Sequence, residues 1–255
     1  MKITEKDLRK LIREAMRSVT LKGFQDQPEV YDKSDSKDGA ESQDFDITVK
    51  GNYPKENVNI LLAEMKSQGI TNKFTQVAVL AVLAKESNLK PKAEKCYTNT
   101  SLSRIREIWP YFKKWDDDKL KELRSDCKKF FNYTYEKGRK NKYGNRPGTD
   151  DGYNYRGRGF NQVTFRGSYE KYARLSGVDI LNNPDKLNEP KVAAKVAVKF
   201  LSNRLKSAFG TNNPPFKTQD EATIAVAEAN CKAPGAKKNC SRAISSARKR
   251  VPHFT

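Results

Sequence analysis

The stretch TQVAVLAVLAKE, residues 75–86, is apolar on nearly every side. Its length and its alanines favour a helix, although its valines would also suit a buried strand. A helix without a polar face must be surrounded by other elements, so this one is predicted to lie at the centre of the fold. The rest of the chain must therefore pack around it.

The surrounding elements are also predicted to be helical, because strand-type alternation is almost absent. Ser101 or Ser103 and the aspartates from Asp116 are suitable N-caps. Gly, Asn and Tyr are frequent over residues 138–161, which are predicted to form a long loop. The sequence thus predicts a mainly α fold, with further helices over residues 55–68, 101–115, 116–133, 163–177, 190–205, 220–230 and 241–250.

The first 51 residues differ from the remainder. Residues 1–17 place apolar groups at helical spacing and are predicted to form a short amphipathic helix. Residues 18–51 contain few large apolar groups and are expected to be a flexible acidic linker before a domain over 52–255. Charges interrupt the apolar positions of the N-terminus, so no signal peptide is expected. No apolar run reaches the roughly 18–20 residues that span a bilayer, so membrane insertion is not expected either.

Charge is unevenly distributed along the chain. There are 50 Lys and Arg against 31 Asp and Glu, a net charge of +19. Residues 23–50 carry eight acids and three lysines, whereas residues 51–255 carry a net charge of +20. A body of this charge is expected to associate with polyanions such as nucleic acid, anionic lipid or an anionic cell wall. The alternative is that the charge serves solubility alone.

Histidine and cysteine limit the possible chemistry. His253 is the single histidine, so a Ser-His-Asp triad or a Cys-His dyad would have to use it. A zinc site built on several histidines is excluded, no Cys-x-x-Cys pair is present, and no metal or cofactor is expected. The four cysteines are too scattered for a disulfide-built scaffold; Cys231 and Cys240 could pair across a loop or stay as buried thiols. Proton transfer is therefore expected to use carboxylates.

Two glutamates are candidates for that role. Glu86 ends the apolar helix, and burial favours the protonated form of a carboxylic acid, which suits a general acid. Alternatively, Glu86 is a solvated helix-end residue, or Lys85 pairs with it and keeps it ionised. Glu94 follows in a polar segment, and two carboxylates facing each other across a groove are the arrangement that glycoside hydrolysis uses.

The segment GYNYRGRGFNQVTF, residues 152–165, can be compared with three kinds of site. A dinucleotide-binding loop needs a third glycine and a preceding strand, and both are missing. An arginine–glycine tail would repeat, whereas RGRG occurs once. A tyrosine-rich loop leading to Gln162 and Thr164 fits a carbohydrate site better, since aromatic rings stack on sugars and amides bond hydroxyl groups.

Three blocks together resemble a known family. AKESNLKPKAEKCYTN (84–99), NKYGNRPGTDDGYNYRGRGFNQVTFRGSYEKY (141–172) and GVDILNNPDKL (177–187) are similar to the glycoside hydrolase family 19 domain, most closely to its bacteriophage-endolysin branch. The resemblance covers roughly residues 70–245, and its middle block is specific. It implies a lysozyme-like, mainly α fold with a deep cleft between two lobes, and inverting hydrolysis of β-1,4-linked N-acetylated sugars.

The resemblance also implies roles for individual residues. Glu86 matches the general acid and Glu94 the general base, while Thr164 matches a hydroxyl that holds the attacking water. The remaining matches line the substrate cleft: Gln162, Tyr155, Ser168 and Asn230. Three departures are Lys85 in place of a histidine, Ser168 in place of an asparagine, and CKAPGAKKNC in place of a Gly-Gly loop after Asn230.

The expected function is therefore peptidoglycan hydrolysis by an endolysin or virion-associated lysin, acting as a monomer from the virion or the infected host cytoplasm. The alternatives are a chitinase and a non-enzymatic basic virion or nucleic-acid-binding protein with a lysozyme-like shell. The N-terminal helix resembles leaders that direct proteins into phage heads and are cut after Ile-x-Glu, as at Ile12-Arg13-Glu14. It could instead dock on another virion protein or on the domain itself.

Overall fold

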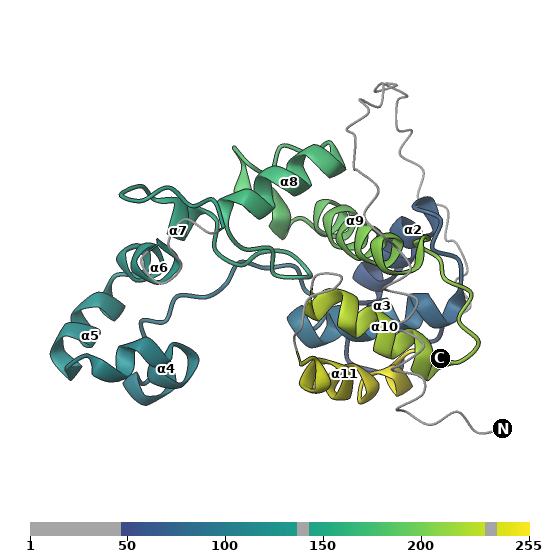
Figure 1. Cartoon of the computed structure of the whole chain (residues 1–255), viewed down its shortest axis with the longest axis horizontal. Helices are drawn as coiled ribbons and strands as arrows, with labels where there is room; N and C mark the ends of the chain where they lie inside the picture. The colour runs from purple at the N-terminus through teal and green to yellow at the C-terminus, as the bar shows by residue number, and fades with distance from the viewer. Residues whose placement is uncertain (1–46, 137–142, 233–238) are drawn as a thin grey trace. The chain divides into compact units, whose positions relative to one another are not determined.

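The computed structural model describes residues 47–136, 143–232 and 239–255. The helix expected over 1–17 and most of the expected linker lie outside these ranges. Within them the chain forms α- and 3-10 helices and two isolated β-bridges, with no longer strand (Figure 1). The prediction of a mainly α fold is confirmed. Among the helices of these ranges, none combines the length and apolar character that crossing a bilayer requires.

The chain divides into two compact units, and the division falls inside the domain expected over 52–255. One unit holds residues 47–51, Met65–Val82 and Leu201–Thr255, and the other holds Asn52–Glu64 and Leu83–Phe200. Three helices continue from one unit into the other: α2 (Lys55–Ser67), α3 (Lys73–Ser87) and α9 (Pro190–Phe209).

Helix α3 is the central buried helix that its composition predicts. Every residue from Val77 to Ala84 is at most 3% exposed. The helix begins where the Asn72 side chain accepts a hydrogen bond from the Thr75 backbone N–H at 3.0 Å. It ends at Ser87, so Glu86 lies in its last turn, where the apolar pattern has stopped.

In the first unit, α10 (Gln219–Cys231) and α11 (Ser241–Arg248) lie side by side (Figure 1). Thr218 and Glu221 form a capping box at the start of α10. The short 3-10 helix η4 (Val251–His253) leads to the C-terminus, where Val49 and Phe254 form an antiparallel bridge. Thus the last residues of the segment expected to be a linker pair with the C-terminal residues.

In the second unit, two predicted helices are each divided. Pro110 has no backbone N–H, so it interrupts the helical hydrogen bonding of the helix predicted over 101–115. In the helix predicted over 116–133, the Asp126 side chain starts a new helix by accepting hydrogen bonds from the backbone N–H groups of Lys128 and Lys129 at 2.9 and 3.0 Å. Ser101 and Asp116 are the N-caps, as predicted. The four resulting elements are α4 (Leu102–Ile108), η1 (Pro110–Lys114), α5 (Asp117–Ser125) and α6 (Cys127–Glu136).

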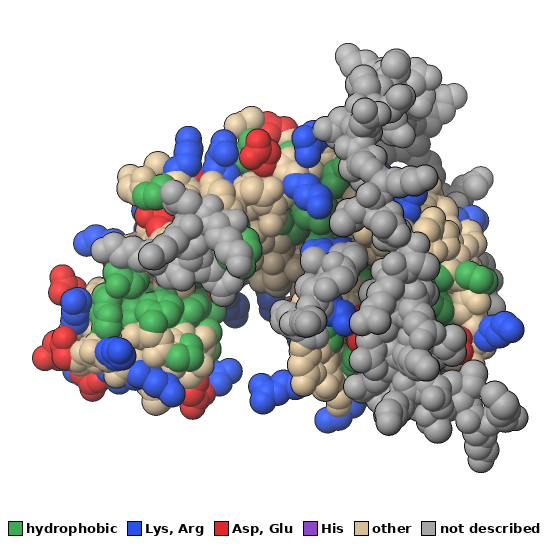
Figure 2. All heavy atoms as spheres, in the orientation of Figure 1, with side chains coloured by type: hydrophobic (Ala, Val, Ile, Leu, Met, Phe, Trp, Pro, Cys, Tyr) green, Lys and Arg blue, Asp and Glu red, His purple; other side chains and the backbone are tan. Residues whose placement is uncertain are grey.

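An aromatic core holds these short helices together. Helices of this length are marginal alone, so their stability depends on packing. Figure 2 shows apolar side chains gathered on the visible face of this region. The disulfide Cys96–Cys127 also fastens the segment before α4 to the start of α6. The core consists of Ile105, Phe112, Leu120 and Phe130, with Tyr97, Leu102, Trp109, Trp115, Leu123 and Tyr133 packed against it.

Three further helical elements complete the second unit. The loop expected over 138–161 contains a short helix, which packs on α6. Residues 166–176 form a helix, as predicted, and a 3-10 turn follows the Asn-Asn pair. These elements are α7 (Asp151–Asn154), α8 (Arg166–Ser176) and η3 (Pro184–Asn188).

The packing of α7 on α6 depends on Gly152. A Cβ at this position would lie 2.6 Å from the Asn132 Cα and 2.7 Å from the Phe131 carbonyl oxygen, both backbone atoms. We expect Gly152→Ala to lower the free energy of unfolding by about 2–3 kcal/mol, because the two helices would have to separate. Gly210→Ala is the control: nothing lies within 4 Å of its added Cβ, and only its φ of +74° opposes the substitution, at about 1 kcal/mol. Equal losses in urea unfolding would contradict the close approach.

Candidate active site

Glu94 lies in the segment between α3 and α4 and is half-buried. Its Oε1 accepts a hydrogen bond from the Tyr97 hydroxyl at 2.8 Å. Its Oε2 accepts one from the Tyr135 hydroxyl at 2.7 Å and one from the Gly157 backbone N–H at 3.3 Å. The Glu94 backbone N–H also donates to the Gly157 carbonyl at 2.7 Å. The Glu94 carboxylate therefore links three parts of the chain: its own segment, helix α6 and the segment 152–165.

Tyr97 is suited to remain a donor in this arrangement. Burial, and then the negative charge of Glu94, raise the pKa of the Tyr97 hydroxyl well above its ordinary value; Arg104 opposes this shift. The phenol therefore keeps its proton, and its hydrogen bond to Glu94, into the alkaline range.

Gln162 is held beside Glu94 by backbone groups. Its Nε2 donates to the carbonyl oxygens of Lys92 and Gly159, each at 3.0 Å. A Cβ on Gly157 would lie 2.9 Å from the Gln162 Oε1 and 3.4 Å from the Glu94 Oε2. Only glycine leaves space for both side chains at this point.

Thr164 belongs to the same turn. Its hydroxyl donates to the Gln162 carbonyl at 3.0 Å. The turn is closed by the bridge between Arg158 and Val163, whose backbone N–H groups each donate to the carbonyl of the other at 3.1 and 2.8 Å. The structure thus places Gln162 and Glu94 on either side of Gly157, and Thr164 bonds to the backbone of Gln162.

Unusual backbone conformations occur next to the candidate residues. In the described ranges, the non-glycine residues with positive φ are Asn88, Leu89, Gln162 and Phe165, with values from 51° to 75°. The first two follow Glu86 and the other two flank Thr164. Such conformations are unfavourable for bulky side chains and gather at functional sites.

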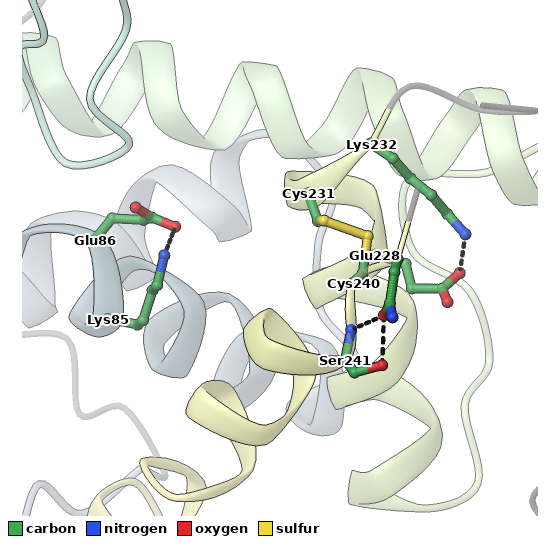
Figure 3. Close-up of a disulfide and its surroundings, with 8 residues drawn as sticks. Lys85, Glu86, Glu228, Cys231, Lys232, Cys240 and Ser241 are labelled. Carbon is green, nitrogen blue, oxygen red and sulfur yellow. Dashed lines mark hydrogen bonds and ion pairs between the residues drawn. A yellow bond between two sulfur atoms is a disulfide. The ribbon is translucent and has the colours of Figure 1, made fainter. Parts of the chain in front are cut away.

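Glu86 is less enclosed than the sequence suggested. Its side chain is 22% exposed, and its Oε1 lies 2.8 Å from the Lys85 Nζ (Figure 3). It lies in the last turn of α3, where the exposed Lys85 precedes it and the buried Ser87 follows it. The alternative in which Lys85 pairs with Glu86 is therefore the one found. The carboxylate faces an ammonium group rather than an apolar wall.

Tyr155 lies in a core rather than in an exposed loop. It is 8% exposed and packs in a core with Val163, Tyr169 and Ile180. Its hydroxyl donates to the Leu181 carbonyl at 3.2 Å. The glycine-rich sequence suggested an open loop, but the tyrosine turns inward to fill the space beside α8.

Ser168 and Asn230 are on two different helices. Ser168 is partly exposed in the first turn of α8, where its backbone N–H donates to the Phe165 carbonyl at 2.9 Å. Asn230 is on α10, in the other unit, one residue before the Cys231–Cys240 disulfide (Figure 3). The sequence left open whether these cysteines form a disulfide or stay as buried thiols, and the structure has the disulfide.

A buried arginine, not anticipated from the sequence, explains part of the specific middle block. The Arg158 side chain is 3% exposed, and its Nε donates to the Asp185 Oδ1 at 2.9 Å. Its Nη1 donates to the Asn154 carbonyl and to the Tyr169 hydroxyl. Burial raises the pKa of Tyr169 to about 12. The second Arg of Tyr-Arg-Gly-Arg-Gly and the Asp of Asn-Asn-Pro-Asp therefore stabilise the fold.

Replacement of Arg158 should be costly. We expect Arg158→Met to lower the free energy of unfolding by about 2–3 kcal/mol, because buried acceptors lose their donor. Arg104→Met is the matched control, since Arg104 and Glu107 form an ion pair in which both side chains are 63% exposed; its cost should stay below about 1 kcal/mol. Similar midpoints for the two variants in urea unfolding would show that the buried guanidinium contributes little.

The described residues contain no group of three or more His, Cys, Asp or Glu side chains that could hold a metal ion. Comparison of the chain with protein-family models and with curated proteins gave no match.

Proposed function

We propose that this protein hydrolyses the β-1,4 glycosidic bonds of peptidoglycan, with Glu86 as general acid and Glu94 as general base. The observation that supports this most strongly is the fixed, half-buried carboxylate of Glu94. A general base needs a carboxylate oriented toward a water molecule rather than neutralised by a cation. Two tyrosine hydroxyls and a backbone N–H orient Glu94, and none of these three donors is a cation.

Thr164 and Gln162 take distinct parts in the proposal. The Thr164 hydroxyl gives its hydrogen to the Gln162 carbonyl, so its lone pairs can accept a hydrogen bond from the attacking water. Both hydrogens of the Gln162 amide are used on backbone carbonyls. Gln162 can therefore meet a sugar only through Oε1, as an acceptor for a hydroxyl or an acetamido N–H.

Glu86 would protonate the oxygen of the leaving sugar. In the structure the Glu86 carboxylate forms an ion pair with Lys85. The lysine must give way, or pass its proton to the carboxylate, when substrate enters. In the inverting reaction the second carboxylate activates a water on the opposite face of the sugar ring.

Charge favours peptidoglycan over chitin as the substrate. Residues 51–255 carry a net charge of +20, and Figure 2 shows lysine and arginine side chains on the visible faces of both units. Bacterial walls carry anionic groups, whereas chitin is neutral, so long-range attraction acts only toward the wall. Action from the virion or from the infected host cell is part of the same proposal.

The test is a comparison of the unaltered protein on purified bacterial walls and on colloidal chitin. We expect the turbidity of the wall suspension to fall, with at most slow release of sugars from chitin. Faster action on chitin would assign the protein as a chitinase. Salt-sensitive DNA binding without any loss of wall turbidity would instead support the non-enzymatic alternative.

A further inference from the structure

The segment that carries Glu94 is attached to α6 at three points. The Cys96–Cys127 disulfide joins the segment to the start of the helix. The ring centroids of Tyr97 and Phe131 lie 5.9 Å apart. Near the end of the helix, the Tyr135 hydroxyl donates a hydrogen bond to Glu94. We propose that Tyr97 and Tyr135 are positioning residues that fix the Glu94 carboxylate and leave Oε1 as the atom that takes the proton from water. This inference rests on the proposed function.

The two hydroxyls act on different oxygens, which determines the orientation. Tyr97 bonds Oε1 at 2.8 Å and Tyr135 bonds Oε2 at 2.7 Å, so the carboxylate cannot rotate about its terminal bond without breaking one of them. The Gly157 N–H also bonds Oε2, which therefore has two donors. An ionised carboxylate offers about two acceptor positions per oxygen. Among the described residues, the acceptor position that receives no donor is on Oε1.

The aromatic rings are themselves fixed by packing. Tyr97 lies with its ring centroid 4.7 Å from that of Trp109. Tyr135 lies 5.8 Å from Phe131 and 5.3 Å from Phe165. Aromatic packing of this kind leaves little freedom for the hydroxyl groups to turn away. Their hydrogen bonds to Glu94 are thus set by the core of the second unit rather than by flexible surface side chains.

Among the described residues, the donors to the Glu94 carboxylate are two phenols and a backbone N–H, and none of them is a cation. The Arg156 Nε donates to the Glu94 backbone carbonyl at 3.4 Å, while its guanidinium lies over the Tyr153 ring at 4.2 Å. The charge of Arg104 lowers the pKa of Tyr97. A bidentate guanidinium would hold the carboxylate ionised so strongly that it would be a poor base. Neutral phenols orient it at a smaller cost in basicity.

The experiment measures wall hydrolysis by Tyr97→Phe, Tyr135→Phe and the double variant over a range of pH. Each single change should lower kcat about tenfold and leave KM within about twofold, since one hydrogen bond to a charged group is lost. The acid limb of the pH–activity profile should move to higher pH by about one unit, because a donor that favours the ionised carboxylate is missing. The double variant should lose about a hundredfold in kcat.

Tyr133→Phe is the matched control. Tyr133 is on the same helix, and its ring lies 4.9 Å from Trp115 and 5.9 Å from Phe112. The wall-hydrolysis rate of the Tyr133→Phe variant and the acid limb of its pH–activity profile should match those of the unaltered protein. A purely structural role for Tyr97 and Tyr135 would change unfolding but not the acid limb. An unmoved acid limb with kcat within twofold would overturn the proposal.

A second measurement does not depend on activity. Nuclear magnetic resonance of ¹³C-labelled tyrosine rings should show that Tyr97 titrates at lower pH in Glu94→Gln than in the unaltered protein, since the Glu94 charge and its hydrogen bond both raise the pKa of Tyr97. Identical titration would refute the contact. A protein that leaves walls intact but shows this shift would refute the proposed function, and the positioning role with it, while confirming the contact.

Discussion

Glu94→Gln is expected to lower the rate of wall hydrolysis about a thousandfold. Glutamine has nearly the shape of glutamate and can still accept a hydrogen bond from Tyr97 or Tyr135, so the local structure should be kept. It cannot take a proton from water, and the reaction loses its base. Glu86→Gln should show a loss of the same order, because an amide cannot protonate the leaving sugar oxygen.

The control is Glu107→Gln. Glu107 is on α4 in the same unit, and its side chain is 63% exposed in a surface ion pair. This variant should keep full activity. Initial rates on purified walls would be compared, with thermal unfolding measured for each variant to show that the fold is intact. A stable Glu86 or Glu94 variant with a rate within tenfold of the unaltered protein would exclude that residue as a catalytic acid or base.

Removing the Cys96–Cys127 disulfide is expected to give the largest loss of stability. The two cysteines are 31 residues apart, whereas Cys231 and Cys240 are 9 apart. Cross-links over longer segments restrict the unfolded chain more, which predicts a loss of about 4 kcal/mol for the first pair and about 2.5 kcal/mol for the second. The first pair also fastens the Glu94 segment to α6, so its loss should lower activity as well.

Each pair would be replaced by serine and the variants unfolded in urea, beside the unaltered protein with and without a dithiol reductant. Of the two variants, the one that keeps Cys96–Cys127 should lose more stability on addition of the reductant, and the unaltered protein, which holds both disulfides, should lose most. If replacement of Cys96 and Cys127 costs less than replacement of Cys231 and Cys240, the longer link does not restrain the unfolded chain as described.

Much of the fold can be predicted from local patterns. The uninterrupted apolar stretch predicts the buried α3, and Ser101 and Asp116 predict helix starts because their side chains accept from the following backbone N–H groups. The divisions at Pro110 and Asp126 were not predicted. The helical spacing of apolar residues continues through both positions. At Asp126, the side chain accepts hydrogen bonds from the backbone N–H groups of Lys128 and Lys129, and this interrupts the helix in a way that the spacing does not show.

The site could be predicted in part. The motifs single out Glu94 and Gln162, and the structure places both beside Gly157, while their roles stay predictions. Tyr135, which lies 41 residues beyond Glu94 in sequence, carries no local sign of its contact. The same is true of Arg158 in the Tyr-Arg-Gly-Arg-Gly motif. Its side chain is buried and pairs with Asp185, so this arginine stabilises the fold. Periodicity and spacing report neighbours along the chain, whereas these contacts depend on tertiary packing.

The most direct measurement follows the products formed from purified peptidoglycan. We expect new reducing ends to appear, with the sugar at each new end released first as the α-anomer, since an inverting attack on a β-linkage gives this configuration. Both signals should vanish in Glu94→Gln. Solubilised wall fragments without new reducing ends would mean that a bond other than a glycosidic one is cut, and release of the β-anomer would contradict a water-activating Glu94.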